Sequence, residues 1–349
     1  MKLNWLAASV SVIVLASATS AGLCAEAGRT RDPALWPFTS TSPWNMPIGD
    51  KAQYVGISSP KFDSSGGGGI NCTKWSHPIF IATVDDPMTT IYLHPRTPPF
   101  PPTAEKPFVT MRVPVNARPD SESDEHLHII DETHSFVVEM IGAVRDRNGK
   151  ITVTWGAVKN SLRDAGVYDT PYHGTRAYGG SAIGGLIRKG ELTHGIHHAL
   201  AVTIEPKAHN RNGPGGKPYV WPASSADGDA DTAYGTTGNL YMGTLLAIPP
   251  TVDITKLGLQ GPDLVLARAL QDYGAYVSDS GGANFQLAAE PTAKDEVAQV
   301  KPEKDWSSLC SLRKLVALVK IVANNSPQSV GGGGKPRCPL APPLAPSPH

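Results

Sequence analysis

Short apolar runs separated by turn-forming residues dominate the middle of the chain. Three of them, at 126–130, 135–144 and 151–158, have the length and the β-branched content of strands. The last two are joined through Asn148-Gly149, the residue pair that tight hairpin turns favour. This pattern predicts a meander of three antiparallel strands.

Further strand-like runs occur along the rest of the chain, at 77–84, 89–93, 108–113, 195–204, 219–222, 240–248 and 275–278. Glycine (35 residues) and proline (32 residues) are abundant while charged residues make up 18%, a composition typical of short strands joined by many turns. We therefore expect an all-β fold, an antiparallel β-sandwich of the jelly-roll type. It should occupy residues 28–330 as one domain, followed by a Gly/Pro-rich C-terminal tail at 331–349.

Two segments have helical periodicity instead. Residues 262–273 place apolar side chains along one stripe and end before Gly274, where a C-cap glycine would stand. Residues 305–323 begin at Asp305, a good N-cap, and also carry one apolar stripe. We expect both helices at the periphery of the domain. The second either packs on its own domain or forms an interface with a partner.

The first 27 residues have the features of a secretory signal peptide. Lys2 precedes an apolar run at 6–18, and Ala25-Glu26-Ala27 offers a cleavage site. The run is shorter than the roughly 20 residues that cross a bilayer, so we expect no transmembrane segment. The protein is therefore predicted to be secreted, either extracellular or periplasmic.

Cysteine usage adds one structural prediction. Cys24 would leave with the signal peptide, so Cys72, Cys310 and Cys338 would remain in an oxidising compartment. We predict a disulfide between Cys310 and Cys338, because it would tie the second helix to the tail. The state of Cys72 is left open.

Charge narrows the range of partners. Lysine plus arginine equal aspartate plus glutamate at 31 each, so the chain has no overall field that would attract nucleic acid. Nucleic-acid binding is therefore not expected. The oligomeric state cannot be predicted from this balance.

Candidate chemistry is concentrated between positions 126 and 209, where most of the 11 histidines lie. Asp124, His126 and His128 alternate along one predicted strand and would share a face, either in a site or exposed to solvent. Glu139 lies in a run that is apolar on both faces. It would be a buried, paired carboxylate or an edge-strand residue that reaches water.

A second group of candidates lies downstream. His198 shares the more apolar face of its predicted strand, as a catalytic group or as a core histidine. Arg188 and Glu191 flank a turn, where they could hold a substrate or pair with each other. Aromatic residues such as Trp44 and Tyr178 could stack on sugar rings or pack in the core.

The motif His126-x-His128 followed by Glu132 is similar to the first metal motif of cupins. In that family two histidines and a glutamate hold one ion inside a β-barrel, which implies a divalent metal as a possible cofactor here. The leading glycine and the second cupin motif are both missing from this sequence.

Several longer stretches resemble a largely uncharacterised group of secreted bacterial proteins. These stretches are Ser42-Pro43-Trp44-Asn45, the segment from Asp124 to Asp131, the segment from Gly184 to Arg188, the segment from Gly195 to Leu200, Tyr219-Val220-Trp221-Pro222-Ala223, and the segment from Ala269 to Gly274 with Asp279. The group has no secure reaction, so the resemblance implies membership and not an activity.

More loosely, the chain resembles β-jelly-roll enzymes that act on polysaccharides, including lyases. That resemblance implies a neutral histidine or tyrosine that takes the proton beside a uronate carboxyl, and an arginine that neutralises this carboxyl. The residues here that could supply these groups are His126, His198, Tyr178 and Arg188.

The sequence thus predicts a secreted protein that cleaves a polysaccharide or oligosaccharide on the concave face of the sandwich, as a lyase or a glycoside hydrolase. The predicted catalytic residues are His126, His198, Glu139, Asp131 and Arg188. The predicted substrate-binding residues are Asp124, His128, Trp44, Asn45, Tyr178, Glu191 and Asp279. No metal ligand and no cofactor are expected on this interpretation. Two alternatives stay open: a non-catalytic carbohydrate- or envelope-binding module, and a cupin-like metalloprotein with a divalent metal.

Overall fold

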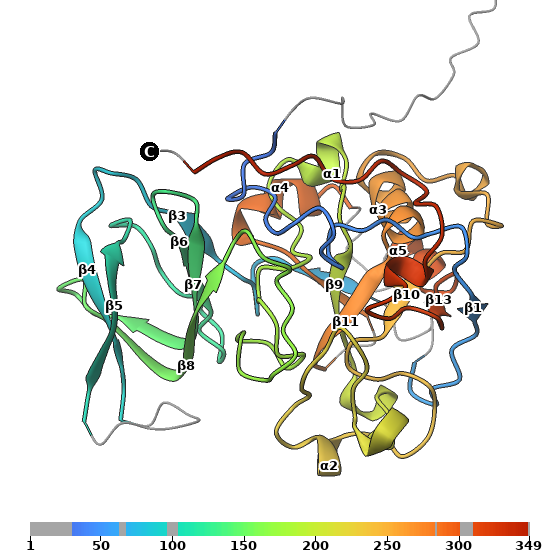
Figure 1. Cartoon of the computed structure of the whole chain (residues 1–349), viewed down its shortest axis with the longest axis horizontal. Coiled ribbons are helices and arrows are strands. Elements are labelled where there is room, and N and C mark those ends of the chain that lie inside the picture. Colours follow the sequence, from blue (N-terminus) through green and yellow to red (C-terminus); the bar gives the residue numbers. More distant parts are fainter. Residues whose placement is uncertain (1–29, 63–67, 96–103, 283–284, 301–309, 348–349) are drawn as a thin grey trace, which may run out of the picture.

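The computed structural model describes residues 30–62, 68–95, 104–282, 285–300 and 310–347. The predicted signal peptide lies outside these residues. Within them the chain forms two mixed β-sheets, and Figure 1 shows most of the helices gathered around the larger sheet. This strand-rich, two-sheet architecture agrees with the predicted β-sandwich class.

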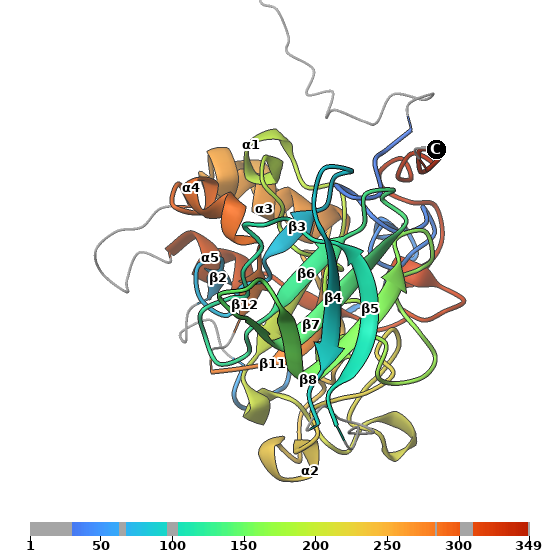
Figure 2. The same cartoon turned by 90° about the vertical axis from the view of Figure 1, so that its left-hand side faces the viewer.

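The six-stranded sheet, here called the small sheet, contains the predicted meander. Its order is β3-β6-β7-β8-β4-β5, with β7 and β8 at its centre, and Figure 2 shows this sheet facing the viewer. The strands are β3 (Ile79–Ile81), β4 (Met88–Leu93), β5 (Lys106–Arg112), β6 (Leu127–Ile130), β7 (Phe136–Arg145) and β8 (Ile151–Ser161).

The hairpin between β7 and β8 forms as the sequence predicts. Gly149 adopts a φ of 85°, and the carboxylate of Asp146 accepts hydrogen bonds from the backbone N–H groups of Asn148 and Lys150. β6, β7 and β8 pair antiparallel, with a bulge at Gly142, where φ is 70°. The meander prediction is therefore confirmed.

The seven-stranded sheet, here called the large sheet, has the order β1-β13-β10-β11-β9-β12-β2. Its strands are β1 (Tyr54–Val55), β2 (Gly69–Asn71), β9 (Leu200–Ile204), β10 (Leu245–Ala247), β11 (Ala275–Ser280), β12 (Gln286–Ala288) and β13 (Lys320–Val322). In both sheets some neighbours are parallel, for example β3 with β6 and β9 with β11. The sheets are mixed, so the prediction of wholly antiparallel pairing was wrong.

Five α-helices lie among the described residues: α1 (Glu191–His194), α2 (Ala230–Ala233), α3 (Gly261–Asp272), α4 (Lys294–Val297) and α5 (Cys310–Val316). α3 is the first predicted helix. It ends at Asp272, and Gly274 just beyond it has a φ of 80° and donates a hydrogen bond back to the carbonyl oxygen of Ala269. Of the second predicted helix, residues 305–309 lie outside the described residues. Its described part, α5, ends at Val316, earlier than predicted, because the chain enters β13 at Lys320. No helix of the described residues is both long enough and apolar enough to span a membrane.

Two hydrophobic cores lie on opposite faces of the small sheet. Leu127 and Ile129 of β6 belong to the core of the small sheet itself. Ile130 of β6 and Val137 of β7 belong to the larger core, which the large sheet shares. Side chains alternate along a strand, so His128 and Glu139 leave the small core and face the large sheet. The polar residues of this region are therefore enclosed between the sheets.

The predicted disulfide between Cys310 and Cys338 is not formed. The thiol of Cys338 donates a hydrogen bond to the carboxylate of Asp272 at the end of α3, and nothing is described of the Cys310 side chain. Cys72 is a buried thiol whose Sγ lies 3.5 Å from the carbonyl oxygen of Glu290. Burial raises the pKa of this thiol to about 11, so it is not a reactive thiolate.

Candidate metal centre

Three histidines from two neighbouring strands meet in the interior. His77 lies two residues before β3, while His126 and His128 lie just before and within β6. The two strands pair in parallel with Ile79 opposite His128, and the N–H of His128 donates to the carbonyl oxygen of Pro78 at 2.9 Å. This pairing brings the three side chains together, and we call them the histidine cluster.

The imidazole rings pack against each other. Their centroids are 4.3 Å apart for His77 and His126, 5.2 Å for His77 and His128, and 5.7 Å for His126 and His128. One ring nitrogen from each residue can be chosen so that all three lie within 4.8 Å of one another. Zn–N bonds of about 2.1 Å separate two tetrahedral ligands by roughly 3.4 Å. Small movements would therefore bring the three nitrogens to one ion.

Two ring nitrogens of the cluster have no hydrogen-bond partner. They are Nδ1 of His126 and Nδ1 of His128, in residues that are 3% and 0% exposed. Buried polar atoms in native proteins nearly always have a partner in the protein, in ordered water or in a bound ion. A bound ligand in the cluster would account for these atoms.

The cluster is electrically neutral. Burial lowers the pKa of His126 to about 3 and holds the pKa of His77 and of His128 well below the ordinary value. The positive charge of Arg176 acts on all three rings in the same direction. The rings are therefore unprotonated at neutral pH, which is the state in which histidine binds a metal ion.

Arg176 is fixed on the large sheet. Its Nε lies 3.4 Å from a carboxylate oxygen of Asp279 on β11, and its Nη2 lies 3.3 Å from the hydroxyl of Thr203 on β9. Its Nη1 is buried and has no partner. Asp279, which was predicted to bind substrate, is thus the ion-pair partner of this arginine.

Glu139 lies opposite His128 across the ladder between β6 and β7. Its Oε2 accepts a hydrogen bond from the N–H of Ala182 at 2.7 Å, and its Oε1 accepts one from the hydroxyl of Ser181. Burial raises the pKa of this carboxyl to about 7, against the opposing effect of these hydrogen bonds. The expected buried and paired carboxylate is confirmed, and it anchors the loop at 181–182.

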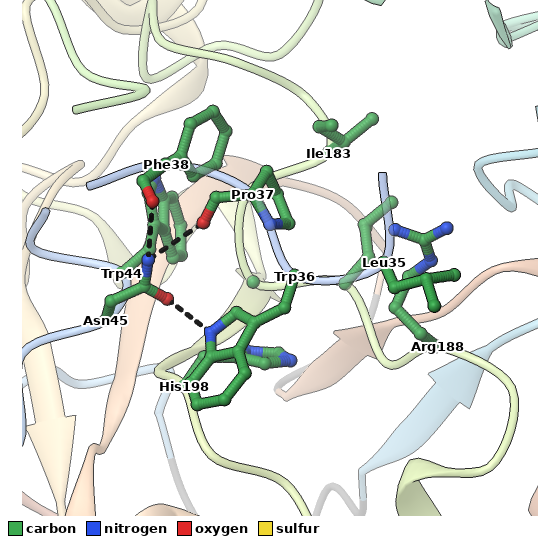
Figure 3. Close-up of a pocket in the computed structure, with 11 residues that line it drawn as sticks. Leu35, Trp36, Pro37, Phe38, Trp44, Asn45, Ile183, Arg188 and His198 are labelled. Carbon is green, nitrogen blue, oxygen red and sulfur yellow. Dashed lines mark hydrogen bonds between the residues drawn. The ribbon is translucent and has the colours of Figure 1, made fainter. Parts of the chain in front are cut away.

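Several other predicted residues line a small pocket (Figure 3). Its lining includes Trp36, Asn45, Arg188 and His198. The amide of Asn45 accepts a hydrogen bond from Nε1 of Trp36 at 2.7 Å and donates one to the carbonyl oxygen of Pro37 at 2.8 Å. The space inside has room for about one water molecule, so this pocket does not accommodate an oligosaccharide.

His198 lies in the loop between α1 and β9, not within the expected strand. Its Nδ1 lies 2.9 Å from the carbonyl oxygen of Ala199, and its Nε2 lies 3.0 Å from the carboxylate of Glu191. Burial alone would lower the pKa of His198, but the Glu191 carboxylate outweighs it and the pKa is raised. Both ring nitrogens face acceptors, which suits an imidazolium paired with Glu191 better than a catalytic base.

Arg188 is committed to a buried ion pair. Its Nε lies 2.9 Å from the carboxylate of Glu290, and its Nη1 donates to the carbonyl oxygen of Ala34 at 3.2 Å. Its positive charge disfavours protonation of both His128 and His198, although the net pKa of His198 is raised by Glu191. Arg188 thus interacts with both the histidine cluster and the pocket.

Asp131 and Asp124 do not join the cluster. The carboxylate of Asp131 accepts hydrogen bonds from the N–H groups of Ser135 and Phe136 at 2.8 and 2.7 Å, which builds the turn between β6 and β7. Glu125 has a φ of 47°, a left-handed conformation that interrupts the strand. The predicted alternation of Asp124 with His126 and His128 on one strand is therefore wrong, because β6 begins only at Leu127.

Trp44 and Tyr178 lie in the larger core. Each is 1% exposed, and their rings meet edge to face with centroids 5.7 Å apart. The Tyr178 hydroxyl donates to the carbonyl oxygen of Ser181 at 2.6 Å. Of the two roles that the sequence allows, sugar stacking and core packing, both side chains therefore have the second.

The cupin pattern is not reproduced. Glu132 lies in the turn after β6 and forms an ion pair with Arg112 at 3.6 Å. The third imidazole of the cluster comes from His77, 49 positions before His126 in the sequence.

No family model, curated protein or solved structure matches this chain. The resemblances seen in the sequence therefore stay predictions. The geometry of the histidine cluster is the basis on which a function can be assigned.

Two residues of this region were missed from the sequence. His77 is the first residue of a predicted strand, and a spacing of two puts it on the same face of that strand as Ile79. Nothing in the local sequence indicates that this strand pairs with β6. Arg176 lies in a glycine-rich stretch without regular structure, where no periodicity points to a partner.

Proposed function

We propose that this protein binds one divalent transition-metal ion between His77, His126 and His128. The observation that supports this most strongly is the convergence of three buried, neutral imidazoles, two of which have a ring nitrogen without a partner. Imidazole suits zinc, copper, iron and nickel, whereas calcium and magnesium prefer oxygen ligands. Zinc is our first choice, because three histidines with a fourth position left for water or substrate are typical of catalytic zinc sites.

The ion would act as a Lewis acid and would lower the pKa of a bound water to about 7. The protein's own residues would supply the rest of the site. The three histidines would hold the ion through neutral nitrogens, and β3 and β6 would fix their spacing. Glu139 holds the adjoining loop at 181–182 in place through two hydrogen bonds.

The substrate class that we propose is a polysaccharide or oligosaccharide outside the cell, as the sequence predicts. Trp75 supports it, because this side chain is 47% exposed and lies two residues before His77, where it could stack on a sugar ring. The carboxylates of Glu139 and Asp131 are both engaged in holding loops. We therefore favour elimination over hydrolysis by a carboxylate pair. Secretion and the jelly-roll connectivity stay predictions.

A second candidate function is a non-catalytic binding module with a structural ion. The burial of the cluster favours it, because His77 and His126 are only 3% exposed and His128 is 0% exposed. Structural zinc sites are closed to solvent in this way, whereas catalytic sites need access for the substrate.

A polysaccharide panel separates the two candidates. The purified protein is assayed after treatment with a chelator and again after reloading with zinc, reading both new reducing ends and the ultraviolet absorbance of unsaturated uronates. We expect activity only in the zinc-loaded protein and none in the His126→Ala variant. Zinc binding without activity on any polymer would favour the binding module, and activity in the metal-free protein would contradict the metal-dependent reaction.

A further inference from the structure

The guanidinium of Arg176 spans two strands of the large sheet. Asp279 on β11 and Thr203 on β9 are register partners, and Arg176 contacts both with Nε and Nη2. Two of its nitrogens are thereby held, so the direction of the third is fixed by the sheet. That third nitrogen, Nη1, is buried and has no partner, in a residue that is 6% exposed.

His77 contacts the chain just after β12, the strand next to β9 in the same sheet. Thr203 of β9 pairs with Gln286 of β12, and the N–H of His77 lies 3.4 Å from the carbonyl oxygen of Ala289, just after β12. The positive charge of Arg176 also lowers the pKa of all three imidazoles. Arg176 and the histidine cluster therefore form one buried neighbourhood between the two sheets.

The charges in this neighbourhood do not balance once an ion is bound. The three imidazoles would hold the ion as neutral ligands, and Asp279 offsets only the charge of Arg176. The carboxylate of Glu139, opposite His128, can offset at most one of the two charges of the ion. A divalent ion would add two positive charges in a region that excludes water, which is unfavourable unless an anion accompanies it. A guanidinium with a free N–H donor is well suited to hold a carboxylate or another oxyanion.

We propose that Arg176, through Nη1, and the metal ion together bind an oxyanion, in the first place the carboxylate group of a ligand. This inference rests on the proposed metal centre and names the chemistry that its ligand must carry. Because the cluster is almost closed to solvent, small carboxylates are the suitable probes.

Cobalt-loaded protein gives a direct test, because the visible spectrum of cobalt(II) changes when an anion enters its coordination sphere. Acetate and formate are titrated into the full-length protein and into the variants Arg176→Gln and Arg176→Lys. Arg163→Gln is the matched control, since Arg163 also has buried nitrogens without partners but is bonded to the Ala345 carbonyl oxygen, away from the cluster.

We expect Arg176→Gln to bind acetate roughly tenfold more weakly or worse, because a charge-assisted hydrogen bond is lost. Arg176→Lys should be intermediate and Arg163→Gln unchanged, while cobalt loading is the same in all. Equal acetate affinity in the wild type and Arg176→Gln would overturn this inference alone. If Arg176→Gln does not fold, equal affinity in the wild type and Arg176→Lys overturns it instead. Failure of the wild type to load cobalt would overturn the proposed function as well.

Discussion

Nδ1 of His77 lies 3.0 Å from Nε2 of His128, although the two residues are 51 positions apart in the sequence. The parallel pairing of β3 with β6 makes this contact, and it turns the His126-x-His128 motif into a three-imidazole cluster. A site built in this way depends on tertiary structure, so the folded state should bind the ion and the unfolded chain should not.

Zinc should therefore stabilise the native protein. At a free zinc concentration of 100 times Kd, we expect about 2.7 kcal/mol of added stability and a matching rise in Tm. His77→Phe retains a ring but removes one ligand, so its Tm should no longer respond to zinc. His134→Ala is the control, because His134 pairs with Asp32 outside the cluster. A zinc response of equal size in His77→Phe would argue against the cluster as the binding site.

Glu139 should matter for stability through its two hydrogen bonds. Glu139→Ala leaves the N–H of Ala182 and the hydroxyl of Ser181 without an acceptor in a buried place, and it opens a cavity. We expect a loss of about 2–4 kcal/mol in the free energy of unfolding. In Glu139→Gln the amide oxygen can accept from the Ala182 N–H and the amide nitrogen can donate to the Ser181 hydroxyl, so this variant should lose about 1 kcal/mol or less. Urea denaturation measures both, and equal losses would contradict this role.

His198 should make stability depend on pH. Its pKa in the folded protein is raised above the ordinary value of 6.5 by Glu191, after burial has acted in the opposite direction. The native state therefore binds the proton more tightly than the unfolded chain. The stabilisation is complete below pH 6.5 and is lost as the pH rises through the raised pKa.

Replacement of His198 by glutamine should flatten this part of the pH profile. Urea denaturation at several pH values from about 5 to 9 measures it. His173→Gln is the control, since His173 is exposed. If stability falls as steeply above pH 6.5 in His198→Gln as in the wild type, the imidazolium is not stabilised by Glu191.

The ion pair of Arg188 with Glu290 is buried, with side chains 10% and 8% exposed. Arg188→Ala should cost about 3–5 kcal/mol in the free energy of unfolding, because it leaves the carboxylate buried without its partner. The double variant Arg188→Met with Glu290→Leu should recover part of this loss. Lys256→Ala breaks an exposed pair with Asp253 and should leave the free energy of unfolding nearly unchanged. A small effect at both positions would contradict the buried pairing.

The sequence predicted those secondary-structure elements that a few neighbouring residues determine. Asn148-Gly149 determined the β7–β8 hairpin, and Gly274 determined the end of α3. The segment at 305–323 was predicted as one helix because Leu312, Val316 and Val319 share a stripe. The chain instead leaves the helix after Val316 and inserts β13 between β1 and β10 of the large sheet. Sheet pairing overrides helical periodicity there.

The candidate site was predictable only in part, for the same reason. A spacing of two marked His126 and His128, but the left-handed Glu125 and the partner strand β3 are tertiary features. His198 was grouped with them on composition, and the structure commits it to Glu191 instead. The disulfide failed because spacing says nothing about proximity, and Cys338 lies beside Asp272.

The metal content of the purified protein tests the central claim most directly. After incubation with excess zinc and removal of unbound metal, elemental analysis should find about one zinc per chain in the wild type. It should find close to none in the double variant His126→Ala with His128→Ala, and about one in His134→Ala. A wild-type protein that is folded and retains no zinc, cobalt, nickel, copper, manganese or iron would contradict the account.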